Sequence, residues 1–294
     1  MSTIPAVHVV YLYIQPTGRG SVDGRVLIGT QGWNYAAWVG PFYPDGTRPA
    51  DMLTLYAQAF GTVEVDSTFY AIPPVNTFRG WAGRTPDSFV FSLKLPQEIT
   101  HERHLRRAHD QTELFIERAR LLGRKLGPIL VQMGPEFSPS DFDALEAFIP
   151  TLPRDLRFAV ELRQERWMRR DVLPDLLALL REHRVALALS DGKWIPRDTV
   201  LELATEPTSD FHYLRWMGPN RDLTDFSHVQ VDRSSELGEW IGVLRMLPAR
   251  GVDIFGYANN HFEGHSPASA RAIQRQLGVT PVDPHEIGEQ ISLF

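Results

Sequence analysis

Eight short apolar segments, each ending in polar or charged residues, recur along the chain and constrain its fold more than any other feature. Helical patterns follow most of them, and strands that alternate with helices pair in parallel. Eight such units in 294 residues predict a single closed (β/α)8 barrel. The predicted strands are 26–30, 62–66, 90–94, 129–133, 158–162, 186–190, 211–215 and 254–258.

Helical periodicity fills the intervals between these strands. Serine, threonine, asparagine or aspartate stands near the start of several patterns, as is typical of helix N-termini. The predicted helices are 51–60, 76–84, 108–125, 138–148, 171–183, 197–204, 234–247 and 266–277.

The barrel is predicted to span residues 26–285, between an N-terminal arm (1–25) and a short C-terminal tail (286–294). The apolar run 6–14 lacks a basic segment before it and a small-residue cleavage site after it, so we expect an extra strand or arm rather than a signal peptide. No run approaches the roughly 20 apolar residues that span a bilayer, so no membrane contact is expected.

Composition excludes several classes of function. The net charge of −6 argues against a nucleic-acid binder with a basic surface all round, so any contact with a polyanion would be a local patch. The absence of cysteine excludes disulfides, thiolate nucleophiles and cysteine-ligated metals, and fits a cytoplasmic protein. No GxGxxG, Walker A or GxSxG motif is present.

Charged side chains gather where the predicted strands end, the face that carries catalysis in such barrels. Strand alternation directs three carboxylates and three cations inward, namely Glu64, Asp66, Glu161, Lys94, Arg163 and Arg215. One interpretation is a structural ion network that closes the barrel. The other is a site in which the cations bind an anion while a carboxylate acts as acid or base.

Several segments, in this order, resemble the YecE-like family, a domain of unknown function (number 72) formed by TIM barrels. The resemblance runs from Ile28 to about Arg271 and implies the barrel independently of the strand count, but it implies no reaction. The matching segments are GTQGWNYAAWVGPFYP (29–44), VEVDSTFYAIPP (63–74), SLKLPQEITH (92–101), LGPILVQMGPEF (126–137), AVELRQERW (159–167), YLRWMG (213–218) and ANNHFEGHSPASA (258–270).

Two positions depart from that family. Gln164 and Met217 stand where members often carry histidine, which puts a mechanism based on those imidazoles in doubt. Positions that match the pattern are Arg163, Trp167, Arg215, Asn259, Asn260 and His261.

Two further groups of residues each allow two interpretations. Aromatic residues after the first two strands, Trp33 and Tyr70 among them, either form a stacking wall for a base or sugar ring or pack the loops together. A metal site built from His101, Glu161, Asp191 and His261 is the weaker alternative to histidines that hydrogen-bond within loops. We therefore expect no metal, and the sequence identifies no cofactor.

The tail ends in Gln290, Ile291, Ser292, Leu293 and Phe294, which resembles the peptide that binds the bacterial DNA sliding clamp. A polar anchor followed by apolar side chains suits such docking, and a free end would be accessible. The alternative is that Leu293 and Phe294 fold back on the barrel.

The leading hypothesis is an enzyme, hydrolase-like and directed at an anionic or phosphorylated substrate, in a setting of nucleic-acid processing. Asp66, Glu161 and His261 are the predicted catalytic residues. The predicted substrate-binding residues are Trp33, Tyr70, Lys94, Gln132, Arg163, Arg215, Asn259 and Asn260. The rival hypothesis is a non-enzymatic nucleic-acid-binding or adaptor protein recruited to the clamp by its tail.

Overall fold

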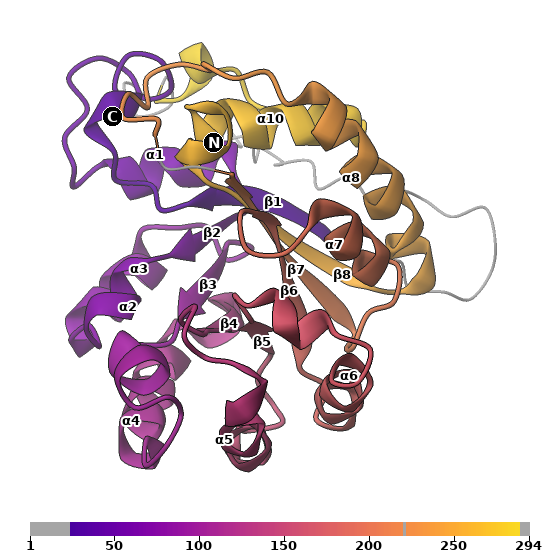
Figure 1. The fold of residues 1–294 in the computed structure, drawn as a ribbon. Helices are drawn as coiled ribbons and strands as arrows, with labels where there is room; N and C mark the ends of the chain where they lie inside the picture. Colours follow the sequence, from indigo (N-terminus) through magenta and orange to yellow (C-terminus); the bar gives the residue numbers. More distant parts are fainter. Residues whose placement is uncertain (1–23, 220–221, 289–294) are drawn as a thin grey trace, which may run out of the picture.

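Eight parallel strands close into a barrel in sequence order in the computed structural model, which describes residues 24–219 and 222–288 (Figure 1). The last strand pairs with the first, so the predicted single (β/α)8 barrel is confirmed. The strands are β1 (Val26–Gln31), β2 (Thr62–Val65), β3 (Val90–Lys94), β4 (Leu126–Gln132), β5 (Phe158–Glu161), β6 (Ala186–Gly192), β7 (Phe211–Gly218) and β8 (Asp253–Ala258). The apolar run 6–14 and the motif 290–294 lie outside the described residues.

Helices surround the barrel (Figure 1), and each of the eight predicted helical patterns overlaps one of them. Two short helices that follow strands directly, α2 and α9, are not predicted by the sequence patterns. The helices are α1 (Met52–Ala59), α2 (Ser67–Tyr70), α3 (Val75–Gly83), α4 (His109–Ala119), α5 (Phe142–Phe148), α6 (Leu173–Glu182), α7 (Arg197–Ala204), α8 (Ser234–Met246), α9 (Asn260–Glu263) and α10 (Ser266–Gln276).

The apolar core forms two layers, because successive side chains on a strand point to opposite faces. Val63, Val65 and Phe91 belong to the layer between the strands and the helices. Tyr213 and Tyr257 belong to the layer inside the barrel. The alternation predicted for these strands is confirmed, so the charged residues between the outward positions face the barrel interior.

Strand β2 is one residue shorter than predicted. It ends at Val65, and Asp66 lies in the turn that leads into α2, where its carbonyl oxygen accepts a hydrogen bond from the Phe69 N–H (3.0 Å). This turn sets Asp66 at the C-terminal end of the barrel, beyond the last strand residue.

An ion network crosses the opposite, N-terminal end of the barrel. Asp253 at the start of β8 accepts hydrogen bonds from Arg25 Nη2 (2.9 Å) and Arg157 Nη1 (2.7 Å). Arg157 Nη2 also donates to Asp210 (2.8 Å), just before β7. These contacts join the starts of strands that are far apart in sequence.

Candidate functional site

Arg215 on β7 is the centre of a buried ion network at the C-terminal end of the barrel. Its Nε and Nη2 donate to the two carboxylate oxygens of Glu64 at 2.9 and 2.7 Å, and its Nη1 donates to Glu161 at 2.5 Å. Tyr213 adds a hydrogen bond from its hydroxyl to Glu64 (2.6 Å). Arg215, Glu64 and Glu161 are each at most 2% exposed, so both carboxylates depend on this guanidinium for charge compensation.

Glu161 is held in its ionised form. Burial alone would raise the pKa of its carboxyl, but the guanidinium groups of Arg215 and Arg163 hold that pKa well below its usual range. Gln132 Nε2 donates to both carboxylate oxygens (3.1 and 3.0 Å) and Arg163 Nε to one of them (2.8 Å). A carboxylate with these partners is a poor proton donor.

Asp66 and Lys94 lie beside this network without joining it. Within residues 24–219 and 222–288, neither the Asp66 carboxylate nor Lys94 Nζ has a hydrogen bond or ion pair in the structure. The Lys94 ammonium instead lies over the ring of Phe69, 3.8 Å from its centroid, and the residue is 7% exposed. A buried lysine and a partly buried aspartate without direct partners are unusual outside functional sites.

The surroundings shift both groups toward their neutral forms. Burial raises the pKa of the Asp66 carboxyl and the negative charge of Glu64 adds to the rise, while Lys94 opposes it. Burial lowers the pKa of the Lys94 amine to about 8, with Asp66 opposing and Arg215 adding to the fall. A proton donor and an amine close to neutrality therefore lie at neighbouring strand ends.

Arg163 lies at the rim of the barrel mouth. Only its Nε binds Glu161, so its terminal nitrogens have no hydrogen-bond partner among the described side chains. Its guanidinium carbon is 5.7 Å from the centroid of the Trp194 ring. Both side chains line an open groove with Pro135, Gln164, Glu165 and Arg166. Arg163 is thus positioned to donate hydrogen bonds to a ligand in that groove.

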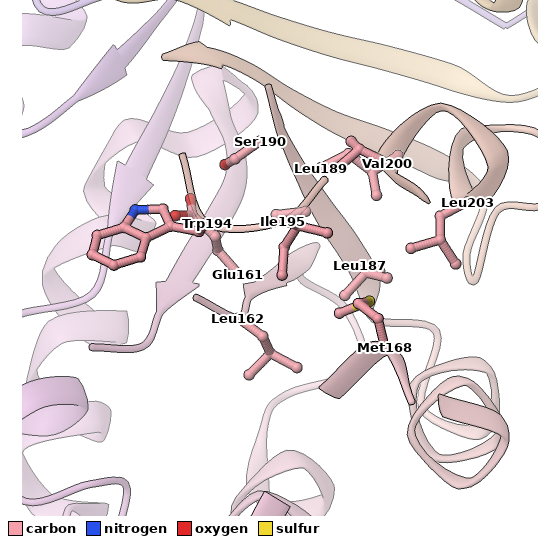
Figure 2. Close-up of a pocket in the computed structure, with 11 residues that line it drawn as sticks. Glu161, Leu162, Met168, Leu187, Leu189, Ser190, Trp194, Ile195, Val200 and Leu203 are labelled. Carbon is pink, nitrogen blue, oxygen red and sulfur yellow. The ribbon is translucent and has the colours of Figure 1, made fainter. Parts of the chain in front are cut away.

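Behind Glu161 the structure contains a small, mostly apolar pocket between β5, β6 and α7 (Figure 2). Its volume of about 20 Å³ suits a single water molecule. Ser190 Oγ lines it and is buried without a hydrogen-bond partner among the described residues. The pocket is too small for a substrate.

His101 is a candidate that sequence reasoning considered only as a ligand of the weaker metal alternative, and not as a catalytic residue. It lies in a π-helical turn, Glu98–Glu102, a conformation often found at functional sites. Its ring packs edge-on against Phe69 (5.0 Å between centroids), and its Nδ1 is 2.9 Å from Thr100 Oγ1. Burial lowers the pKa of the imidazole, and the charges of Lys94 and Arg163 lower it further. The one available signal was its place in the loop that follows Lys94.

Asn259 and Asn260 organise the loop after β8. Asn259 Oδ1 accepts the backbone N–H of His261 (2.8 Å), and Asn259 Nδ2 donates to Gln31 (2.6 Å). Asn260 is buried, and its Oδ1 accepts hydrogen bonds from Trp38 Nε1 (3.2 Å) and the Ser266 hydroxyl (2.8 Å). The Asn260 side chain therefore holds α9 against α10 and the first loop, and a role in substrate binding for either asparagine stays a prediction. The His261 ring packs on Phe226, 5.2 Å between centroids.

Part of the predicted aromatic wall packs the first loop. Trp38, Phe42 and Tyr43 are buried, whereas Tyr70 is 72% exposed beside Phe69. Trp33 is partly buried, and its ring meets that of Trp81 edge-on at 5.8 Å. Loop packing explains these buried members, whereas Trp33 and Tyr70 stay candidates for stacking on a ligand.

The metal arrangement considered for the mouth has other partners. Asp191 accepts hydrogen bonds from Trp240 Nε1 (2.7 Å) and from Arg197. Among the described residues no group of three or more histidine, aspartate or glutamate side chains is arranged to hold a metal ion.

In the same part of the chain, no helix has the length and apolar character required to cross a membrane.

Comparison with known proteins identifies relatives along nearly the whole barrel. The model of a family described as "Protein of unknown function DUF72" matches residues 27–289. The protein YecE of Escherichia coli K12 is 30% identical over 138 residues, which are 47% of this chain and 48% of that protein. The match thus spans about half the length of YecE. The protein YunF of Bacillus subtilis is 24% identical over 271 residues, covering 86% of this chain and 95% of YunF.

Solved structures agree with the fold. A DUF72 family protein of Thermotoga maritima superposes with a TM-score of 0.71 at 23% identity, covering 86% of this chain and 99% of that one. A DUF72 family protein of Enterococcus faecalis gives 0.70 at 19% identity, covering 88% and 100%. These structural similarities support the barrel fold.

Proposed function

The chain belongs to the DUF72 family, whose description names no reaction, and we propose from its own side chains that it is an enzyme acting on an anionic substrate at the barrel mouth. The observation that carries the proposal is the pair of the buried Lys94 and the partly buried Asp66, neither with a direct partner among the described residues, beside a network in which the other charges are compensated. A purely structural network would leave no such pair, because an unpaired buried charge lowers stability.

The anionic group of the substrate binds Lys94 and Arg163. Both present nitrogen donors without a partner among the described residues, and both depress the pKa of the same imidazole, His101, so they act on a common region. Phosphate oxygens suit an ammonium and a guanidinium together. Arg215 has a different role, since its donors bind Glu64 and Glu161 and fix the positions of those carboxylates.

Hydrolysis of a phosphoester is the reaction that these groups serve most directly. His101, neutral near pH 7, accepts a proton from the attacking water as the oxygen–phosphorus bond forms. Asp66 in its protonated form donates its proton to the leaving oxygen as the ester bond breaks. Each proton transfer of this kind contributes about 10²–10⁴-fold to rate.

A panel of phosphomonoesters and phosphodiesters tests the proposal, with phosphate release as the measurement. Lys94→Met and Arg163→Met should each lower kcat/KM by at least about tenfold and weaken calorimetric binding of inorganic phosphate. Arg169→Met is the matched control, because this exposed arginine pairs with Asp171 outside the mouth. Wild-type protein that neither binds phosphate nor hydrolyses any ester of the panel would overturn the proposal.

We further propose that residues 290–294 recruit the protein to a DNA sliding clamp, which would direct the enzyme to phosphodiesters in nucleic acid. The support is the sequence Gln-Ile-Ser-Leu-Phe together with its point of attachment. Ile287 is buried and the Gly288 N–H donates to Gln58 Oε1 on α1 (2.9 Å), so the motif follows a segment fixed to the barrel.

Pull-down with purified clamp tests this second proposal. Deletion of 290–294, or replacement of Leu293 and Phe294 by alanine, should abolish capture without changing turnover of small esters. If wild-type protein is not captured, the clamp proposal fails. Steeply salt-dependent binding of single-stranded DNA without turnover of any ester would instead favour the non-enzymatic adaptor.

A further inference from the structure

Lysine is rare in this chain. Only three of the 30 lysine and arginine residues are lysines, at positions 94, 125 and 193. Guanidinium and ammonium serve equally as positive charges, but only an amine loses its proton readily and attacks a carbonyl carbon. Because nearly all other basic residues of this chain are arginines, the lysine at the barrel mouth suggests a role that needs an amine.

The three lysines have different surroundings. Lys125 Nζ donates to the carbonyl oxygens of Ala82 (2.6 Å) and Thr85 (2.7 Å), so its ammonium is fixed as a structural donor. Lys193 is exposed, with its ammonium 4.5 Å from the centroid of the Trp194 ring. Lys94 alone combines burial with the absence of any acceptor or carboxylate within bonding distance among the described residues.

We infer that Lys94 is an amine nucleophile that forms an imine with the carbonyl group of a small anionic aldehyde or ketone bound at the barrel mouth. The inference goes beyond phosphoester hydrolysis and rests on the proposed function in one respect, the anion-binding role of Arg163. The placement supports it. Lys94 Nζ lies over Phe69, and Glu64 on β2 and Asp66 just after β2 lie at the same end of the barrel.

The chemistry balances with the groups at the site. The neutral Lys94 amine attacks the carbonyl carbon and forms a carbinolamine after proton transfer from nitrogen to oxygen. Asp66 protonates the hydroxyl group, which leaves as water while the nitrogen lone pair forms the C=N bond. The protonated imine then carries the positive charge, facing the carboxylates of Asp66, Glu64 and Glu161. No oxidant or further reactant is needed.

The charged groups around Lys94 are consistent with a reactive amine. Burial and, to a smaller extent, Arg215 favour the neutral form, while Asp66, Glu64 and Glu161 favour the ammonium. The resulting pKa of about 8 leaves a useful neutral fraction of the Lys94 amine near pH 7. An ordinary exposed lysine, with a pKa of about 10.4, is almost wholly protonated there.

Reductive trapping tests the inference. The full chain is incubated at pH 7 with glyoxylate and cyanoborohydride, which reduces an imine to a stable carboxymethyl amine, and modified lysines are located by peptide mass spectrometry. We expect Lys94 to be modified at least about tenfold faster than Lys125 and Lys193. Lys94→Met should remove that adduct alone. Arg163→Met should slow modification by glyoxylate but not by the neutral propionaldehyde.

The outcomes separate this inference from the proposed function. Modification of Lys94 no faster than of Lys193 would overturn the inference, and calorimetric binding of phosphate by the same preparation would leave the proposed anion site intact. Rapid trapping at Lys94 without phosphate binding or ester hydrolysis would support the amine chemistry and remove the phosphoester function. Denaturation of each variant in urea confirms that it is folded.

Discussion

At the scale of single residues, Lys94 should reduce stability while it serves the site. Its pKa of about 8 lies below the ordinary 10.5 because burial disfavours the ammonium. At about 1.4 kcal/mol for each pH unit between those values, the ammonium costs about 3 kcal/mol at neutral pH. Lys94→Met should therefore raise the free energy of unfolding at pH 7, measured in urea. A variant less stable than wild type would show that Lys94 is a structural cation.

The pH dependence gives an independent measurement of the same effect. Between about pH 8 and pH 10.5 the unfolded chain holds the Lys94 proton while the folded chain has released it. The free energy of unfolding contributed by Lys94 therefore rises with pH across that window. The difference between wild type and Lys94→Met should shrink as the pH increases, and a difference independent of pH would contradict the burial of the amine.

Arg215 should behave in the opposite way. Replacing it with methionine leaves the carboxylates of Glu64 and Glu161 buried without their main counter-charge. Breaking a buried ion pair from one side typically costs about 3–5 kcal/mol. We expect Arg215→Met to lower the free energy of unfolding by that amount, with Tyr213→Phe, which removes one hydrogen bond to Glu64, costing less. An Arg215→Met variant as stable as wild type would contradict the network.

At the scale of elements, the short helix α2 positions the amine of β3. The Thr68 hydroxyl donates to the Lys94 carbonyl oxygen (2.7 Å) and accepts from the Lys94 N–H (3.1 Å). Because Phe69 follows in the same helix, these bonds set the ring under the ammonium. Thr68→Val keeps the shape and removes both bonds, so we expect a loss of about 1–3 kcal/mol in stability and slower trapping at Lys94.

Thr68→Ser is the matched control for that prediction, since it keeps the hydroxyl. It should retain most of the trapping rate and lose only the stability contributed by one methyl group. Equal trapping rates in Thr68→Val and wild type would show that α2 does not position the site.

The helices and strands also show which parts of the fold can be predicted from sequence patterns. The eight strands are predictable because short apolar runs between turn and helix signals repeat at a spacing that suits one architecture. Helices α2 and α9 have four residues each, fewer than a periodic pattern needs to be recognised. Their first residues depend on the turns after β2 and β8, which an apolar pattern does not contain. The pattern therefore predicts Asp66 as a strand residue, whereas in the structure it lies in a turn.

At the scale of the whole molecule, barrel closure decides which charges meet. Alternation along β2, β5 and β7 predicted that Glu64, Glu161 and Arg215 face inward, but their pairing joins residues separated by up to 151 positions in sequence. The pairing depends on strand order and register around the closed sheet, which no local pattern contains. The sequence therefore predicts which charged side chains face inward better than how they pair, and it leaves Asp66 and Lys94 indistinguishable from the compensated charges.

The two ends of the barrel should separate stability from function. At the N-terminal end, Arg25 and Arg157 hold the pKa of Asp253 below its usual value against the effect of burial, so its ionised form stabilises the fold. At the mouth, burial raises the pKa of Asp66, so its ionised form does not. Asp253→Asn should lower the free energy of unfolding by about 1–3 kcal/mol at pH 7 and leave turnover unchanged.

Asp66→Asn should have the reverse effect, with stability retained or increased and turnover lowered by about 100-fold or more. Acid supplies the confirming measurement. The stability that Asp253 contributes is present near neutral pH and is lost as the pH falls through its depressed folded pKa, so the wild-type advantage over Asp253→Asn should vanish in strong acid. If Asp66→Asn instead unfolds the protein while turnover per folded molecule is unchanged, the Asp66 carboxyl has a structural role and the proposal that it donates a proton is wrong.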